Sequence, residues 1–307
     1  MYGMSIFSIE RNINEWTYKA YNESGRKLSE LMTINGGIGT DSFYWIKCEP
    51  NFPSFADFIF GYREKVFAVA VIRTRITSGH REIDSDLRGI AFLEEMSAKN
   101  DFIPCLMPIN QDLTFLLPGW GLMNPGFVTK GENLTLIHPE DMGDDEENAE
   151  ISPWELRNLA SMTVRDEIRK TTPNIRGIMT VDAPVSPELI YYDENGDLNY
   201  VIIRYVVLPS TKVEMNDAAG IHQKMTELLK KHAHGHFTIV GFKSPESDGK
   251  LYRLKGIQIA LNRIVPIRDE DIRKGTEILS TFRSLIETST THDDNAVEAE
   301  NDDSGNT

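Results

Sequence analysis

The sequence has few cysteines, no long hydrophobic run and no excess of basic residues. Cys48 and Cys105 are its only cysteines, and both are expected to be buried free thiols and not parts of a disulfide or metal site. No apolar run approaches the ~20 residues of a membrane span. Residues 1–10 lack a basic region followed by an apolar core. These absences predict a cytoplasmic protein without a signal peptide or a membrane anchor.

The acidic excess is concentrated in two segments. The formal net charge is −15, but residues 140–150 contain seven acids and residues 293–303 contain six, with no base in either segment. The rest of the chain therefore carries a net charge of only −2. Both acidic segments are expected to be solvated and mobile. The near-neutral remainder gives no support to nucleic acid as a partner.

One block of the sequence occurs twice in similar form. Residues 57–73 (DFIFGYREKVFAVAVIR) align without a gap with residues 188–204 (ELIYYDENGDLNYVIIR), at a constant offset of 131 residues. Each copy begins with an acid, forms two apolar strands around a polar turn, and ends with an arginine. Such self-similarity predicts an internal duplication. The alternative is two unrelated α/β domains with a similar order of helices and strands.

Hydrophobic periodicity predicts the same order of elements in each half. In the first half, helices are expected from Asn12 to a glycine-rich stop at 35–40 and over 86–100, with strands at 43–47, 57–62, 66–73, 102–107 and 113–117 and a polar loop at 76–85. In the second half, helices are expected at 152–170 and 218–232, with strands at 177–181, 189–192, 200–208, 236–242 and 251–259. Ser152, Pro153 and Glu155 form a strong helix start. A final helix at 272–286 has no counterpart in the first half.

These elements predict an α/β (α+β) protein of two tandem, similar α-β-β-β-α-β-β domains that pack as a pseudo-dimer. The first domain is expected at 1–137 and the second at 152–288. An acidic linker at 138–151 separates them, and a disordered acidic tail follows at 289–307. The strand after the second helix of each unit is expected to run parallel to an earlier strand.

The order helix, strand, acid-led strand, turn, strand, helix, strand resembles the restriction-endonuclease-like fold of the PD-(D/E)XK nuclease superfamily. In that family an acid opens the second strand and an acid-x-lysine motif follows on the third. Two carboxylates hold Mg²⁺, and the lysine orients or activates the attacking water. Asp57 and Glu188 match the first acid in position. The secretion-chaperone-like fold has nearly the same order of elements and remains open.

The rest of the nuclease motif is missing. Residues 69–73 and 200–204 contain no carboxylate and no lysine, and their apolar side chains cannot bind magnesium. Both units therefore look like degenerate nucleases without a cofactor. A metal-dependent nuclease that uses Mg²⁺ would need relocated acids, for which Glu49 and Asp182 are the candidates. Arg73 and Arg204 can bind a carboxylate or a phosphate, or pair with the acid across each hairpin.

Two other features are candidate sites. His232, His234 and His236 alternate, so that they could share one face of a strand and bind a metal. They are also compatible with a plain helix end capped by Gly235. Trp120, in a tight turn, is a candidate anchor for a partner or a ring that covers the edge of the domain.

Taken together, the residues predict a non-catalytic interaction or scaffold protein with a protein partner and no membrane contact. A metal-dependent nuclease is the catalytic alternative. A chaperone- or immunity-type protein that holds one dedicated partner is the third possibility.

Overall fold

The computed structural model describes residues 15–35, 43–48, 55–77, 80–84, 87–142, 149–172, 174–180, 187–210, 218–229, 233–253 and 255–267. The chain divides into two compact units. Unit 1 comprises Met1–Leu159, Thr180–Val185 and Leu251–Lys255, and unit 2 comprises Ala160–Met179, Ser186–Lys250 and Gly256–Thr307. The division falls inside a helix and not in the acidic segment 138–151, because the first turn of that helix packs into the core of unit 1.

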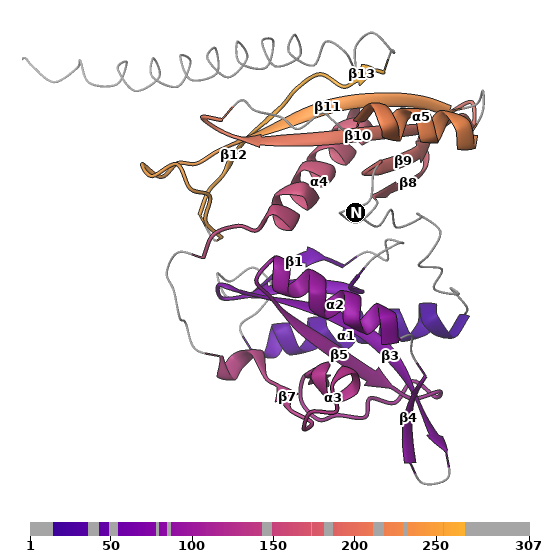
Figure 1. Cartoon of the computed structure of the whole chain (residues 1–307), viewed down its shortest axis with the longest axis vertical. Helices are drawn as coiled ribbons and strands as arrows, with labels where there is room; N and C mark the ends of the chain where they lie inside the picture. Colours follow the sequence, from indigo (N-terminus) through magenta and orange to yellow (C-terminus); the bar gives the residue numbers. More distant parts are fainter. Residues whose placement is uncertain are drawn as a thin grey trace, which may run out of the picture. The chain divides into compact units, whose positions relative to one another are not determined.

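Unit 1 is built on one mixed sheet. Its elements are α1 (Glu15–Ile34), β1 (Phe43–Lys47), β2 (Phe58–Tyr62), β3 (Lys65–Thr77), β4 (His80–Asp84), α2 (Leu87–Lys99), β5 (Phe102–Ile109), β6 (Leu122–Met123), α3 (Gly126–Thr129) and β7 (Leu136–Ile137), followed by a 3₁₀ turn at Pro139–Asp141. The strand order is β1-β2-β3-β5-β6-β7, with β4 paired to β3. Among the described strands of this unit, β3 and β5 form the parallel pair. The β3–β4 hairpin projects beyond the body of the sheet (Figure 1).

Helices cover both faces of this sheet. Residues 66–70 of β3 are buried without interruption, as expected for a central strand in a parallel pair. Phe67 and Val69 pack in one core cluster with Leu28 of α1, which we call the α1 face. The α2 face is the opposite cluster, where Ala68 packs with Leu93 of α2.

Unit 2 repeats this plan. Its elements are the greater part of α4 (Pro153–Thr171), then β8 (Arg176–Thr180), β9 (Leu189–Tyr192), β10 (Leu198–Val207), α5 (Ala218–Leu229), β11 (Ala233–Lys243), β12 (Gln258–Leu261) and β13 (Val265–Pro266). The strand order is β12-β11-β10-β9-β8, with β13 paired to β11. Strands β10 and β11 are parallel. Tyr200 and Ile202 pack with Met225 of α5, on what we call the α5 face.

The two sheets confirm two similar α+β units. Reading from the first strand of each unit, β1-β2-β3-β5-β6 and β8-β9-β10-β11-β12 follow the same order, and the third and fourth strands are parallel in both. The predicted parallel crossover is therefore present twice. The pseudo-dimeric packing stays a prediction.

The predicted gapless alignment of the two repeat copies is wrong by one residue. Phe58 pairs with Val69 in unit 1, whereas Leu189 pairs with Val201 in unit 2, so the second hairpin contains one additional residue. By strand alternation Arg73 then lies on the α1 face and Arg204 on the α5 face, so they are not equivalent. A slip normally exposes a buried face. It is tolerated here because the middle of β3 and the middle of β10 are buried on both faces.

Local signals at the start of α4 are confirmed. The Ser152 N–H donates to Oε2 of Glu155 at 2.9 Å, and the Glu155 N–H donates to Oγ of Ser152 at 3.2 Å. This is the reciprocal capping box that the sequence predicts. Cys105 is buried as expected, but Cys48 is exposed at the end of β1.

Several expected elements differ. The polar loop at 76–85 includes β4, and the strand at 113–117 is reduced to one bridge between Ile109 and Phe115. The strand expected at 251–259 begins only at Gln258. Gly235 lies inside β11 and does not cap a helix.

Backbone hydrogen bonds hold the C-terminal end of the acidic linker. The Ile151 N–H donates to the Leu251 carbonyl at 2.9 Å, and the Arg253 N–H donates to the Ala149 carbonyl at 2.8 Å. Residues 143–148, the final helix at 272–286 and the tail at 289–307 lie outside the described residues.

Candidate functional site

The acids at the nuclease-like position are used to hold each hairpin together. The carboxylate of Asp57 accepts a hydrogen bond from the Val71 N–H at 2.7 Å, and Asp57 is 8% exposed. Glu188 is 1% exposed, accepts from the Ile203 N–H at 2.9 Å and forms an ion pair with Arg204 at 3.0 Å. The pairing of Arg204 across the hairpin is confirmed.

The neighbouring strand positions offer no second acid. Val69 and Ala70 are buried in unit 1, as are Val201 and Ile202 in unit 2. Within the described ranges, no group of three histidine, cysteine or acidic side chains could hold a metal ion. Glu49 and Asp182, the candidates for relocated acids, lie outside those ranges.

Sequence reasoning missed the buried Lys47. This lysine ends β1, is 5% exposed, and its Nζ donates to the Ala56 carbonyl at 2.8 Å, directly before Asp57. A lysine at the end of the aromatic strand FYWIK is the available signal, because a buried ammonium needs hydrogen-bond acceptors. The structure thus brings a lysine near the peptide of Asp57 from the first strand, not from the third.

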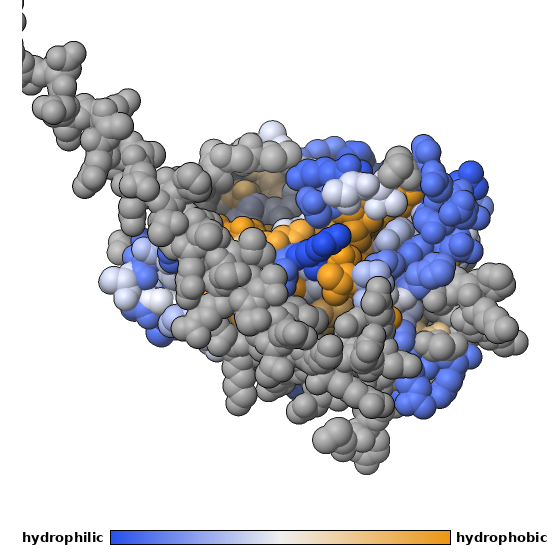
Figure 2. Space-filling view, turned by 90° about the horizontal axis from the view of Figure 1, so that it is seen from above, coloured by the Kyte–Doolittle hydropathy of each residue, from blue (hydrophilic) through white to orange (hydrophobic). Residues whose placement is uncertain are grey.

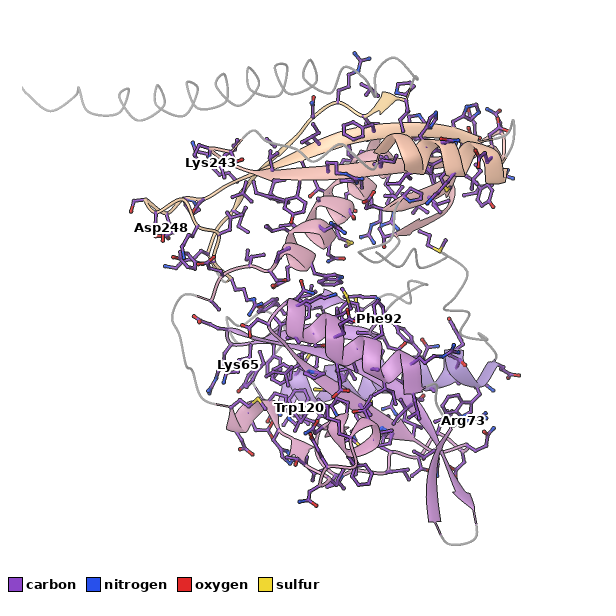
Figure 3. The ribbon with its side chains drawn as sticks, viewed as in Figure 1. Lys65, Arg73, Phe92, Trp120, Lys243 and Asp248 are labelled. Atoms are coloured by element: carbon purple, nitrogen blue, oxygen red, sulfur yellow. The ribbon has the colours of Figure 1, made fainter. Side chains whose placement is uncertain are left out.

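Arg73 belongs to a small cluster near the end of β3 (Figure 3). Its guanidinium lies 5.5 Å from the centroid of the Trp16 ring and donates to Oε1 of Gln111 at 3.2 Å. Trp16 Nε1 in turn donates to the Gln111 carbonyl at 3.1 Å. The cluster joins α1 to the loop after β5, and Arg73 is half-buried in it.

Trp120 is not a surface anchor. It is 1% exposed and stacks with Phe43 and Phe60, at centroid distances of 5.6 and 5.9 Å. Figure 3 shows it within the body of unit 1. The turn that carries Trp120 folds its ring inward, onto the α1 face.

Two of the three candidate histidines are described, and their surroundings differ. His234 is exposed, with Nε2 3.8 Å from Asp197, and His236 is largely buried on β11. Burial lowers the pKa of His236, and its Nδ1 has no hydrogen-bond partner in the part of the chain that the structure describes. His232 lies outside that part. A pair that the sequence did not reveal is Tyr200 and His222, whose Oη and Nδ1 are 2.6 Å apart.

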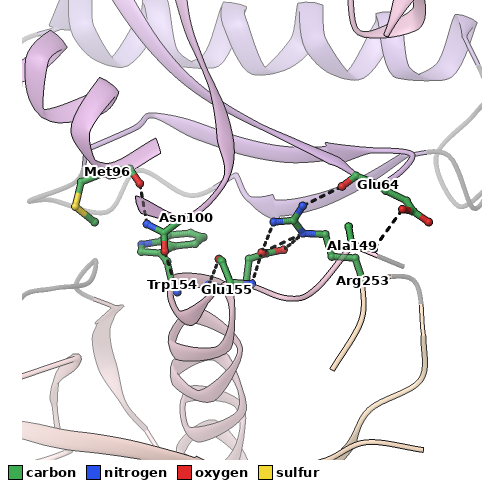
Figure 4. A network of polar contacts seen from close by, with 8 residues as sticks. Glu64, Met96, Asn100, Ala149, Trp154, Glu155 and Arg253 are labelled. Atoms are coloured by element: carbon green, nitrogen blue, oxygen red, sulfur yellow. Dashed lines mark hydrogen bonds and ion pairs between the residues drawn. The ribbon is translucent and has the colours of Figure 1, made fainter. Parts of the chain in front are cut away.

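A buried ion pair fixes the segment at Arg253 within unit 1 (Figure 4). Nη2 of Arg253 lies 2.9 Å from Oε2 of Glu155, and Nη1 donates to the Glu64 carbonyl at 2.9 Å. Burial raises the pKa of the nearby Tyr44, and the negative charge of Glu155 adds to this effect. The network connects a turn, a helix start and a distant loop, which is a structural role.

The edge strand β8 has exposed residues over most of its length. Arg176, Gly177 and Met179 are exposed, and so is Tyr192 on the neighbouring β9. We call these four residues the β8 edge. In the equivalent edge strand of unit 1, β1, no residue is exposed, and the Asn158 side chain donates to the Ile46 carbonyl at 3.2 Å.

Comparison with protein-family models, curated proteins and solved structures finds no match for this chain. Among the described helices, none is both long and apolar enough to cross a bilayer. The fold defines a two-unit α+β protein.

Proposed function

We propose that this protein is a non-catalytic cytoplasmic interaction protein, built from two degenerate nuclease-like units, that binds an extended segment of a protein partner at the β8 edge. The observation that carries the proposal is the contrast between the two equivalent edges. The β1 edge of unit 1 receives a side-chain hydrogen bond from Asn158, whereas β8 ends its sheet among the described strands with most of its residues exposed.

An exposed edge strand offers backbone groups on which a partner strand can add. Met179 and Tyr192 are 42% and 47% exposed. Methionine and tyrosine are side-chain types that are enriched in protein interfaces. Backbone pairing would supply affinity and these side chains would supply specificity.

The test compares proteins captured from native cells by the full chain, by Met179→Lys/Tyr192→Ser, and by Ile259→Ser. Ile259 is 41% exposed on β12, at the other edge of the same sheet, and serves as a matched control. We expect the β8 double variant to lose a defined partner that the Ile259 variant retains. Purified partner and chain should then bind in calorimetry. Equal capture by all three proteins would contradict binding at the β8 edge.

A further inference from the structure

The α5 face of unit 2 is only partly covered. Six of its apolar side chains are buried, and around them lie partly exposed ones: Ile190, Leu208, Ile221, Ala260, Val265 and Ile267. Figure 2 shows hydrophobic residues at the surface in the view from above, with hydrophilic residues beside them. Apolar side chains that stay partly exposed over one sheet face leave a surface on which a further apolar element can pack.

The corresponding α2 face of unit 1 is closed by the helix that follows its repeat. Trp154, in the first turn of α4, is 3% exposed and packs edge-on against Phe55 and Phe102, each at a centroid distance of 5.6 Å. Beneath it Ala68 and Ile72 are almost fully buried. In unit 1, therefore, the chain that leaves the last strands of the repeat supplies its own cover.

The chain that leaves unit 2 is placed to do the same. Ile267 belongs to the α5 face, and its N–H donates to the Gly235 carbonyl at 2.8 Å. Forty residues follow it. If residues 272–286 are helical, their apolar side chains fall within an arc of about 140° around the helix axis. They are Ile272, Ile278, Leu279, Phe282, Leu285 and Ile286.

We propose that residues 272–286 form an amphipathic helix that docks in cis on the α5 face of unit 2. The four residues Arg268, Asp269, Glu270 and Asp271 are polar and connect the helix to the end of the described chain. The internal duplication supplies the precedent, since the helix after the first repeat covers the α2 face of unit 1. This inference rests on the α5 face and is independent of the β8 edge.

Hydrogen exchange on the full chain tests the docking. In the unaltered protein, peptides from 278–286 should exchange more slowly than peptides from 290–307. Leu279→Asp/Phe282→Asp should accelerate exchange in peptides from 258–267 by about tenfold or more, because local opening becomes easier. The control Ser280→Asp/Ser284→Asp places equal charge on the opposite side of the helix and should leave those rates unchanged.

A variant of the receiving surface gives a second measurement. Ala260→Glu, on β12, should accelerate exchange in peptides from 278–286 while the charge pattern of the helix stays intact. Equal exchange in 278–286 and in the acidic tail of the unaltered protein would overturn the proposal. So would identical effects of the two double variants. A sedimentation mass of two chains that falls to one in Leu279→Asp/Phe282→Asp would replace cis docking by docking of a second copy.

Discussion

Gly61 is a residue at which unit 1 has no room for a side chain. It pairs with Tyr44 across β1 and β2, and a Cβ atom there would lie 2.0 Å from Cζ of the tyrosine. The tyrosine ring would have to move within a packed sheet. We expect Gly61→Ala to lower the free energy of unfolding by about 1–3 kcal/mol, the usual range for overpacking. Urea denaturation followed by tryptophan fluorescence measures it, because all four tryptophans lie in unit 1.

Gly89→Ala is the matched control for this prediction. Gly89 lies in α2, and nothing lies within 4 Å of a Cβ built there. Alanine should stabilise the helix by about 0.5–1 kcal/mol, since glycine loses more conformational freedom on folding. A loss of equal size in both variants would show that the effect is not steric.

The imidazole of His236 should make unit 2 sensitive to acid. Burial lowers the pKa of His236 from its ordinary value of 6.5, and this effect outweighs the backbone hydrogen bonds with His234 and Tyr200, which raise it. The unfolded chain therefore binds this proton at a higher pH than the folded chain does. Its contribution to stability is complete above about pH 6.5 and is lost as the pH falls through the lower pKa of the folded state.

Two variants isolate this contribution. Between about pH 7.5 and 5, the midpoint of thermal unfolding followed by circular dichroism should fall less in His236→Gln than in the unaltered protein. His234→Gln, at an exposed position on the same strand, should retain most of the fall. An equal fall in His236→Gln and in the unaltered protein would assign the acid sensitivity to other groups.

At the scale of elements, the ion pair between Arg253 and Glu155 determines how a loop and a helix start assemble in unit 1. Both side chains are nearly buried, so Arg253→Met would leave an uncompensated carboxylate. We expect a loss of about 3–5 kcal/mol of unfolding free energy, the range for breaking a buried pair. Tryptophan fluorescence during urea denaturation measures this loss.

A second substitution should restore part of that stability. Glu155→Gln removes the unpaired negative charge, and a glutamine can still form the capping-box hydrogen bond with Ser152. Arg253→Met/Glu155→Gln should therefore be more stable than Arg253→Met alone. Lys99→Met, which breaks an exposed ion pair with Glu95, should change little. If the double variant is no more stable than the single one, the loss comes from packing and not from charge.

At the scale of the whole molecule, purified protein with Mg²⁺ or Mn²⁺ should not cleave DNA or RNA. Asp57 and Glu188 each accept a backbone hydrogen bond, and apolar side chains occupy the positions of the second acid. A fluorescent-substrate assay checks this expectation. Metal-dependent cleavage that disappears in Asp57→Ala or Glu188→Ala would overturn it. Cleavage that survives both substitutions would indicate a contaminant.

The sequence by itself predicted features that depend on neighbours along the chain. The start of α4 follows from Ser152 and Glu155, three residues apart. The repeated order of helices and strands predicted two similar sheets with a parallel pair in each. Apolar alternation and capping act over a few residues, so these features can be read without knowing what lies across the sheet.

Only the tertiary structure decided which side chains meet. The polar segment that contains β4 forms a strand because β3 extends beyond the core and offers it a partner. Trp120 turns inward because Phe43 and Phe60 receive its ring. Arg253 pairs with Glu155, which lies 98 residues away in the sequence. The extra residue in the second hairpin could not be predicted from the sequence. Strands that are buried on both faces are apolar at every position, so their hydrophobic pattern does not show which face a residue occupies.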